Sequence, residues 1–240
     1  MTFKSYQKGG ISLDKKGIIF DLMGKEIYIH DTVVNSWIIV ILLSIFAIYI
    51  NSKIKKAKVD EKPKGILNII EITVQSIQNL VTDTMGKDKM KFAPYIGTLA
   101  LYLAVANLFG LIGFTPPTSD YNVTFALAII TFVLTQLFAI KSKGVGGFGK
   151  SFFEPFAFLF PINVIGELAN PISLSFRLFG NILSGVIIMG LLYNALQGLW
   201  FLIPVATPLL HGYFDVFAGL IQTFIFIMLT MVFISMAMDD

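Results

Sequence analysis

Residues 171–190 read PISLSFRLFGNILSGVIIMG, an apolar stretch that carries one arginine, Arg177. The chain contains no other arginine. The apolar stretch extends on both sides, from about Phe152 to Leu196. That length exceeds the roughly 20 residues that a helix needs to cross a bilayer. The stretch therefore predicts a long membrane-embedded helix with a positive charge inside it.

The rest of the chain favours the same fold class. Of 240 residues, 55% are hydrophobic and 14% are charged, which excludes a water-soluble fold. The apolar runs are apolar on every face, unlike the alternating strands of a membrane barrel. We expect an all-α integral membrane protein with one membrane domain over residues 33–240, after an N-terminal extracytoplasmic segment over residues 1–32. The expected membrane spans lie near residues 33–50, 95–112, 123–140, 152–196 and 201–238.

The last two spans are too long for upright helices. A helix of about 30 residues is roughly 45 Å long, whereas the hydrocarbon core is about 30 Å thick. These two regions are therefore either steeply tilted helices or several shorter pieces. Four prolines mark candidate kinks or helix starts: Pro161, Pro171, Pro204 and Pro208.

The lysines predict the orientation. They gather in four clusters, Lys4 to Lys25, Lys53 to Lys64, Lys87 to Lys91 and Lys141 to Lys150. The dense cluster directly after the first span indicates a cytoplasmic loop, which places the N-terminus outside and the C-terminus in the cytoplasm. Residues 66–85 are amphipathic and lie between Pro63 and Gly86, so we expect a helix on the cytoplasmic membrane surface. A water-exposed helix packed on a partner is the alternative.

Polar residues recur inside the apolar C-terminal half. At about 100° per residue, one set falls within roughly a third of a helix circumference: Asn163, Glu167, Asn170, Ser173, Arg177, Asn181 and Ser184. A second set shares one face of the last span: His211, Asp215, Gly219 and Gln222. Two antiparallel helices with facing polar stripes are expected to enclose a hydrated, protonatable path. For His211, which follows Pro208, the simpler interpretation is a solvated histidine at the membrane interface.

Arg177 needs a compensating partner or a functional reason, because an arginine at the centre of a membrane helix costs about 2.5 to 3.5 kcal/mol on insertion scales. The structural interpretation is a salt bridge to Glu167 or Asp215. The functional interpretation is a permanent cation that meets a mobile carboxylate. Lysine would serve less well, because burial can discharge an ammonium group but not a guanidinium.

The motif around Arg177 resembles that of a known family. Residues 171–181, PISLSFRLFGN, look like the signature of subunit a of F-type ATP synthases, and residues 107–117 (NLFGLIGFTPP) and 221–230 (IQTFIFIMLT) support the resemblance. By this resemblance Arg177 matches the essential arginine of the family, Asn181 the asparagine after it, and Gln222 the glutamine of the last helix. Asp215 stands where relatives carry glutamate or histidine, whereas Val186 occupies a position that is ionisable in many relatives.

The resemblance implies a non-catalytic, ion-translocating stator subunit in a bacterial plasma membrane, with two offset half-channels that meet the rotor at Arg177. The implied partners are the rotor ring of subunit c, the peripheral-stalk subunit b, other ATP synthase subunits and the lipid bilayer. No nucleic acid, cofactor or metal is expected, and the sequence has no phosphate-binding loop. A stand-alone ion channel or secondary transporter is the alternative function, and a membrane scaffold with Arg177 in a structural pair is a third.

Overall fold

The computed structural model describes residues 17–22, 25–56, 64–196 and 203–239. Within these ranges, five helical segments are long and apolar enough to cross a membrane, so the predicted all-α membrane fold is confirmed. The five segments are Asp31–Ile54, Lys87–Ile112, Tyr121–Ser151, Ala157–Ala195 and Ala206–Met238. Most of the expected extracytoplasmic segment, residues 1–16 and 23–24, lies outside the described residues.

The elements follow the chain in a simple order. A two-stranded antiparallel hairpin, which the sequence did not predict, precedes the helices. The strands are β1 (Gly17–Leu22) and β2 (Lys25–His30). The α-helices are α1 (Asp31–Ile54), α2 (Ile66–Met85), α3 (Ala93–Leu108), α4 (Tyr121–Ser151), α5 (Phe160–Ala195), α6 (Ile203–His211) and α7 (Gly219–Asp239). Short 3-10 segments are η1 (Lys87–Phe92), η2 (Phe109–Ile112), η3 (Pro117–Ser119) and η4 (Ala157–Leu159), and η7 (Gly212–Ala218) is a π-helix.

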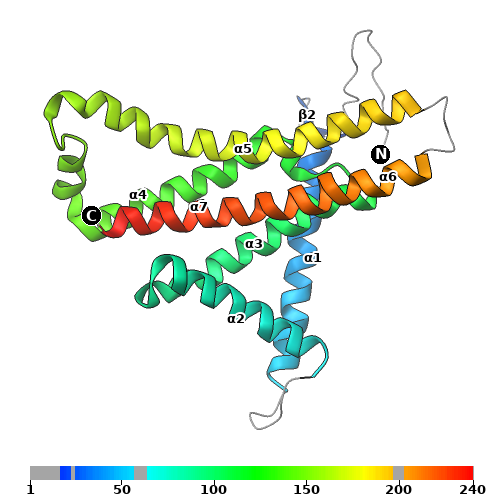
Figure 1. Ribbon diagram of the computed structural model, residues 1–240, viewed down its shortest axis with the longest axis horizontal. Coiled ribbons are helices and arrows are strands. Elements are labelled where there is room, and N and C mark those ends of the chain that lie inside the picture. Colours follow the sequence, from blue (N-terminus) through cyan, green and yellow to red (C-terminus); the bar gives the residue numbers. More distant parts are fainter. Residues whose placement is uncertain (1–16, 23–24, 57–63, 197–202, 240) are drawn as a thin grey trace.

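The two longest helical runs, α5 and α6–η7–α7, lie side by side and cross α1 instead of standing parallel to it (Figure 1). Their chain directions are opposite, so the start of α5 lies at the end of the molecule where α7 finishes. The end of α4 lies at that same end, whereas α6 lies at the other. The arrangement agrees with the expected long, tilted helices.

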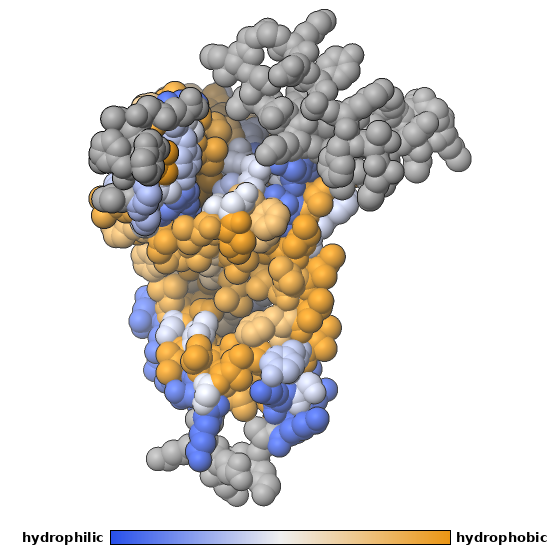
Figure 2. Space-filling view, turned by 90° about the vertical axis from the view of Figure 1, so that its right-hand side faces the viewer, coloured by the Kyte–Doolittle hydropathy of each residue, from blue (hydrophilic) through white to orange (hydrophobic). Residues whose placement is uncertain are grey.

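The core of the membrane domain lies between α3, α4, α5 and α7. Its fully buried side chains include Ile96, Leu103, Leu178, Phe226 and Met231, which come from three of these helices. Helix α1 contributes little to this core and exposes a continuous apolar surface, with Ile45 60% and Ile48 70% exposed. Figure 2 shows a broad hydrophobic band over the middle of one face, with hydrophilic residues below it. Such a band is the surface that hydrocarbon chains cover.

The amphipathic helix α2 has the bounds that its sequence pattern predicted, Ile66–Met85. Its second half packs inward, because Val81 and Met85 are buried in the core that α3 and α7 also form. Its first half leaves apolar side chains uncovered, with Ile69 63% and Ile72 56% exposed. The helix therefore combines attachment to its own chain with an apolar face that suits a membrane interface.

Two details of the long segments differ from the simplest expectation. Helix α4 passes Ile140 and reaches Ser151, but a kink at Gly144, with φ of 71°, divides it into a long helix and a short helical piece. Helix α5 runs unbroken through Pro171, although it starts at Phe160 and not near Phe152. Prolines at membrane depth are tolerated because neighbouring helices compensate for the lost backbone hydrogen bond.

Candidate functional site

Arg177 lies on the exposed face of α5, near the middle of the helix. Leu174, Ser175 and Leu178, on the other face of the same turns, are buried. Within the described part of the chain, no hydrogen bond or salt bridge joins the guanidinium of Arg177 to another residue. The apolar residue Phe176, which is 54% exposed, lies beside it. Among the described residues, Arg177 is thus an unpaired cation on the exposed face of an apolar helix.

Aromatic packing fixes this part of α5 against the start of α4. The ring of Tyr121 lies 4.9 Å from that of Phe176 and 5.7 Å from that of Phe179, as measured between centroids. The two phenylalanines flank Arg177 in sequence, so their contacts hold its backbone on both sides. The guanidinium position therefore depends on a rigid packing contact and not on an ion pair.

The register between α5 and α7 places Arg177 level with Gln222. Asn181 donates a hydrogen bond from Nδ2 to the carbonyl of Ala218 at 3.3 Å. One turn further along α5, a Cβ atom added at Gly185 would lie 3.5 Å from Cβ of Phe214. Extending this antiparallel register by about one turn in the other direction pairs Arg177 with Gln222. Gln222 is only 5% exposed, and its Nε2 has no hydrogen-bond partner among the described residues.

Neither of the two carboxylates that were candidate partners of Arg177 is paired with it. Glu167 accepts a hydrogen bond from Gln136 of α4, with 2.9 Å between Nε2 and Oε2. Asp215 is hydrogen-bonded through Oδ2 to Nδ1 of His211, one turn earlier. Both carboxylates thus have partners other than Arg177.

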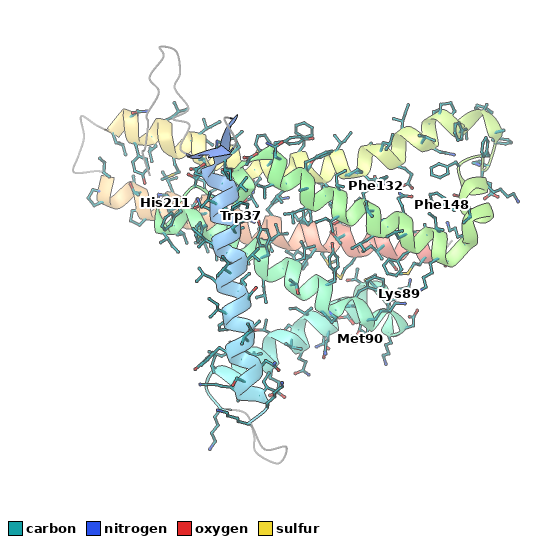
Figure 3. The ribbon with its side chains drawn as sticks, turned by 180° about the vertical axis from the view of Figure 1, so that it is seen from behind. Trp37, Lys89, Met90, Phe132, Phe148 and His211 are labelled. Carbon is teal, nitrogen blue, oxygen red and sulfur yellow. The ribbon has the colours of Figure 1, made fainter. Side chains whose placement is uncertain are left out.

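His211 is not the merely solvated histidine that its position suggested. Its Nδ1 contacts Asp215, its Nε2 lies 2.7 Å from the hydroxyl of Tyr193, and its side chain is only 26% exposed. Figure 3 shows His211 at the end of the molecule opposite Lys89 and Met90. Sequence projection missed Tyr193 because its partner lies on a different helix.

The residues of the polar stripe predicted for α5 lie in several different environments. Glu167 and Asn170 line a small cleft with Thr131 and Thr135 of α4. Asn163 donates to the carbonyls of Phe152 and Glu154 at 2.9 and 3.0 Å, so it closes the turn before α5. Ser173 is exposed on the same side as Arg177, and Ser184 donates to the carbonyl of Asn181. The stripe is therefore not one continuous polar surface facing α7.

The second stripe is also divided, because η7 is a π-helix and its residues do not follow a rotation of 100° each. Gly219 faces α3, where a Cβ atom would lie 3.2 Å from Cβ of Asn107. Asn107 is 2% exposed and bonds to the Gly219 carbonyl, to Thr223 Oγ1 and to Thr118 Oγ1 at 2.9, 3.0 and 2.7 Å. The polar group that positions α7 is thus Asn107, which the sequence interpretation did not include among the site residues.

A further polar cluster joins the start of α1 to the segment between α3 and α4. Thr32 donates to Asp120 Oδ2 at 2.8 Å, and Thr115 donates to Asp31 Oδ2 at 2.8 Å. His30 Nδ1 lies 2.7 Å from Asp31 Oδ1 and 3.9 Å from Asp120 Oδ2. These contacts explain why α1, which has few core contacts, is fixed at this end.

Fold and site together define a class of protein. It is a multi-pass helical membrane protein that carries carboxylates and a cation within its apolar helical segments, as ion-translocating proteins do. The family described as ATP synthase A chain matches residues 33–235 of this chain. The chain is 37% identical over 208 residues to ATP synthase subunit a of Moorella thermoacetica, an alignment that covers 86% of this chain and 90% of the relative.

Two other relatives show the same likeness. The sodium-ion-specific ATP synthase subunit a of Propionigenium modestum is 36% identical over 226 residues, covering 87% of this chain and 74% of the relative. Subunit a of Geobacter sp. (strain M21) is 36% identical over 214 residues, with coverage of 87% and 88%. The chain therefore belongs to the ATP synthase A chain family and is a membrane subunit of an ion-translocating F-type ATP synthase.

Proposed function

We propose that this chain is the stator subunit that exchanges ions with the rotor ring, and that Arg177 is the group that the ring carboxylate meets. The single observation that carries the proposal is the position of Arg177, exposed on an apolar helix surface and unpaired within the described residues. A charge in that setting is costly unless an opposite charge arrives from another polypeptide. The ring of subunit c supplies that carboxylate.

In the proposed mechanism, two aqueous half-channels reach the level of Arg177 from opposite sides without joining. Close to the guanidinium the ionised form of the ring carboxylate is favoured, so the carboxylate releases its ion there. The fixed positive charge also blocks direct leakage between the half-channels. Each ion therefore has to travel with the ring, and the membrane potential contributes about 2.3 kcal/mol per charge per 100 mV.

The candidate path residues divide between the two ends of α5. Glu167 and Asn170, with Asn163 and Ser173, belong to the half toward the start of α5, which we place on the cytoplasmic side. Asn181, Ser184, His211 and Asp215 belong to the half toward the external side. Gln222, level with Arg177, is the buried amide donor between them. ATP chemistry belongs to other subunits, and the chain is non-catalytic.

We also propose the extent of the membrane domain, its orientation in the membrane and its partner subunits. The membrane domain is one unit from residue 33 to 240, in a bacterial plasma membrane, with the N-terminal 32 residues outside and the C-terminus in the cytoplasm. The partners are the ring of subunit c, the peripheral-stalk subunit b and other ATP synthase subunits. The lysines near the end of α4, which lies at the end of the molecule opposite α6, support this orientation.

The test is the variant Arg177→Ala in sealed membrane vesicles. We expect ATP-driven ion pumping to be lost, while the complex still assembles, because no described contact within the chain depends on the guanidinium. Lys150→Ala is the matched control, since it removes one positive charge from an exposed i,i+4 pair with Glu154. Coupled pumping by Arg177→Ala at the wild-type rate would refute the proposal.

A further inference from the structure

Tyr193 is not among the proposed ion-pathway residues, yet it is the outermost member of a continuous series of hydrogen bonds. Its hydroxyl lies 2.7 Å from His211 Nε2, and His211 Nδ1 is hydrogen-bonded to Asp215 Oδ2. We propose that Tyr193, His211 and Asp215 form a proton path that carries protons from the external surface into the half-channel that leads to Arg177. The inference rests on the proposed function, including its orientation, and adds the route by which protons reach it.

Exposure falls along the three residues in the direction that such a path requires. Tyr193 is 38% exposed, and the side chains of His211 and Asp215 are 26% and 16% exposed. Tyr193 comes from α5, His211 from the end of α6 and Asp215 from η7. The path therefore crosses from the surface of one long helix to the interior side of the other.

The chemistry of the three groups allows one proton to pass without leaving a charge on the tyrosine or the histidine. A neutral imidazole has one protonated nitrogen and one acceptor nitrogen. When Nδ1 carries the proton, Nε2 accepts a proton from the Tyr193 hydroxyl, which takes a replacement from water. The Nδ1 proton then moves to the Asp215 carboxylate, which becomes a neutral acid. The first tautomer is restored when Nε2 returns its proton to external water and Nδ1 takes one from the same water, so that no proton is drawn back from Asp215.

The inner end of the path is shaped by the backbone around Asp215. A Cβ atom at Gly110 of η2 would lie 3.5 Å from Asp215 Oδ2, so the glycine leaves the carboxylate room beside the backbone. From Asp215 to Gln222 is about 10 Å along the helix axis, at roughly 1.5 Å per residue. Asn181, which bonds to the Ala218 carbonyl, lies between these two levels. In the described part of the chain, the titratable groups bonded to His211 are Tyr193 and Asp215.

The test is passive proton conduction through the assembled membrane complex after removal of the catalytic sector. Tyr193→Phe keeps the ring and removes the hydroxyl. We expect conduction to fall roughly fivefold, the effect of losing one hydrogen bond of ordinary net strength. Tyr213→Phe is the matched control, because Tyr213 lies one turn from Phe217, stacks on it, and forms no hydrogen bond to a described residue. The control should conduct like the wild type.

Rescue by a mobile buffer separates a proton path from a structural role. Imidazole at rising concentration on the external side should restore conduction in Tyr193→Phe, because it delivers protons directly to His211. Wild-type conduction in Tyr193→Phe, or a loss that imidazole does not restore, would overturn the inference. If Tyr193→Phe does not assemble with the ring, His211→Gln is examined instead. External imidazole should restore its conduction by delivering protons to Asp215, and wild-type conduction, or a loss that imidazole does not restore, would overturn the inference.

ATP-driven pumping, measured alongside passive conduction, distinguishes failure of this inference from failure of the proposed function. Arg177→Ala should lose ATP-driven pumping with or without external imidazole, because its defect lies at the ring and not in proton delivery. A wild-type result for Tyr193→Phe alongside loss of ATP-driven pumping in Arg177→Ala would overturn the path alone. Normal coupled pumping in Arg177→Ala would overturn the proposed function itself.

Discussion

Replacing Asn107 with leucine is expected to destabilise the contact between α3 and α7. The side chain is 2% exposed and bonds to the carbonyl of Gly219, to Thr223 and to Thr118. Hydrogen bonds between membrane helices contribute about 0.6 kcal/mol on average, and buried ones in proteins about 1 kcal/mol. Loss of three such bonds predicts a decrease of about 2 to 3 kcal/mol in the free energy of unfolding. Leucine has the same branching and the same number of heavy atoms, so the substitution leaves no cavity.

The free energy of unfolding is measured on the purified protein in mixed micelles, as the fraction of denaturing detergent at which helical circular dichroism is lost. Asn68→Leu is the matched control, because Asn68 is exposed on α2 and forms no hydrogen bond to a described residue. The control should unfold at the wild-type detergent fraction. If Asn107→Leu changes the free energy of unfolding by less than about 0.5 kcal/mol, the network does not hold α7 as the structure indicates.

Three further predictions concern the helix contacts and the proposed path. Gly219→Ala should lower the free energy of unfolding by about 1 to 3 kcal/mol, since its Cβ would lie 3.2 Å from Asn107. Gly180→Ala, with open space around the added Cβ, should be neutral. Equal unfolding midpoints for the two variants in the same assay would contradict this. Asp215→Asn should slow ion translocation and change the dependence of its rate on external pH, because a titratable group that bonds to His211 is removed. An unaltered pH profile would leave Asp215 only a structural role. Charge exchange between Arg177 and Glu167 should not restore pumping, since Glu167 bonds to Gln136 instead; restored pumping would favour a scaffold.

Much of the fold was predictable, because a membrane-spanning helix requires an apolar run of sufficient length and such runs are visible in the sequence. The bounds of α2 were predicted from its amphipathic pattern between Pro63 and Gly86. The hairpin of β1 and β2 was missed, because the length of an apolar run identifies membrane-spanning helices and gives no information about short strands. The short helical piece after the kink at Gly144 was missed, because the glycines at 144, 146, 147 and 149 weaken its helix signal.

The candidate site was less predictable, because it depends on contacts between residues far apart in sequence. The motif around Arg177 identified the residue, and its exposure on α5 could only come from the structure. Projection at a constant angle grouped Gly219 with Asp215, yet η7 is a π-helix and Gly219 faces Asn107. Asn107 itself lies 112 residues from Gly219, so no local pattern could reveal that pair. Tyr193 was overlooked for the same reason.

The central claim, that the face of α5 carrying Arg177 meets the rotor ring, is tested most directly by disulfide crosslinking. The chain has no cysteine, so Ser173→Cys, on the exposed side of α5 one turn before Arg177, provides a single reactive thiol. With a second cysteine placed beside the ring carboxylate, oxidation should link the two subunits in membranes. Ile41→Cys, on the 57% exposed surface of α1, should form no link. Absence of a link from Ser173→Cys, or an equal yield from Ile41→Cys, would contradict the account.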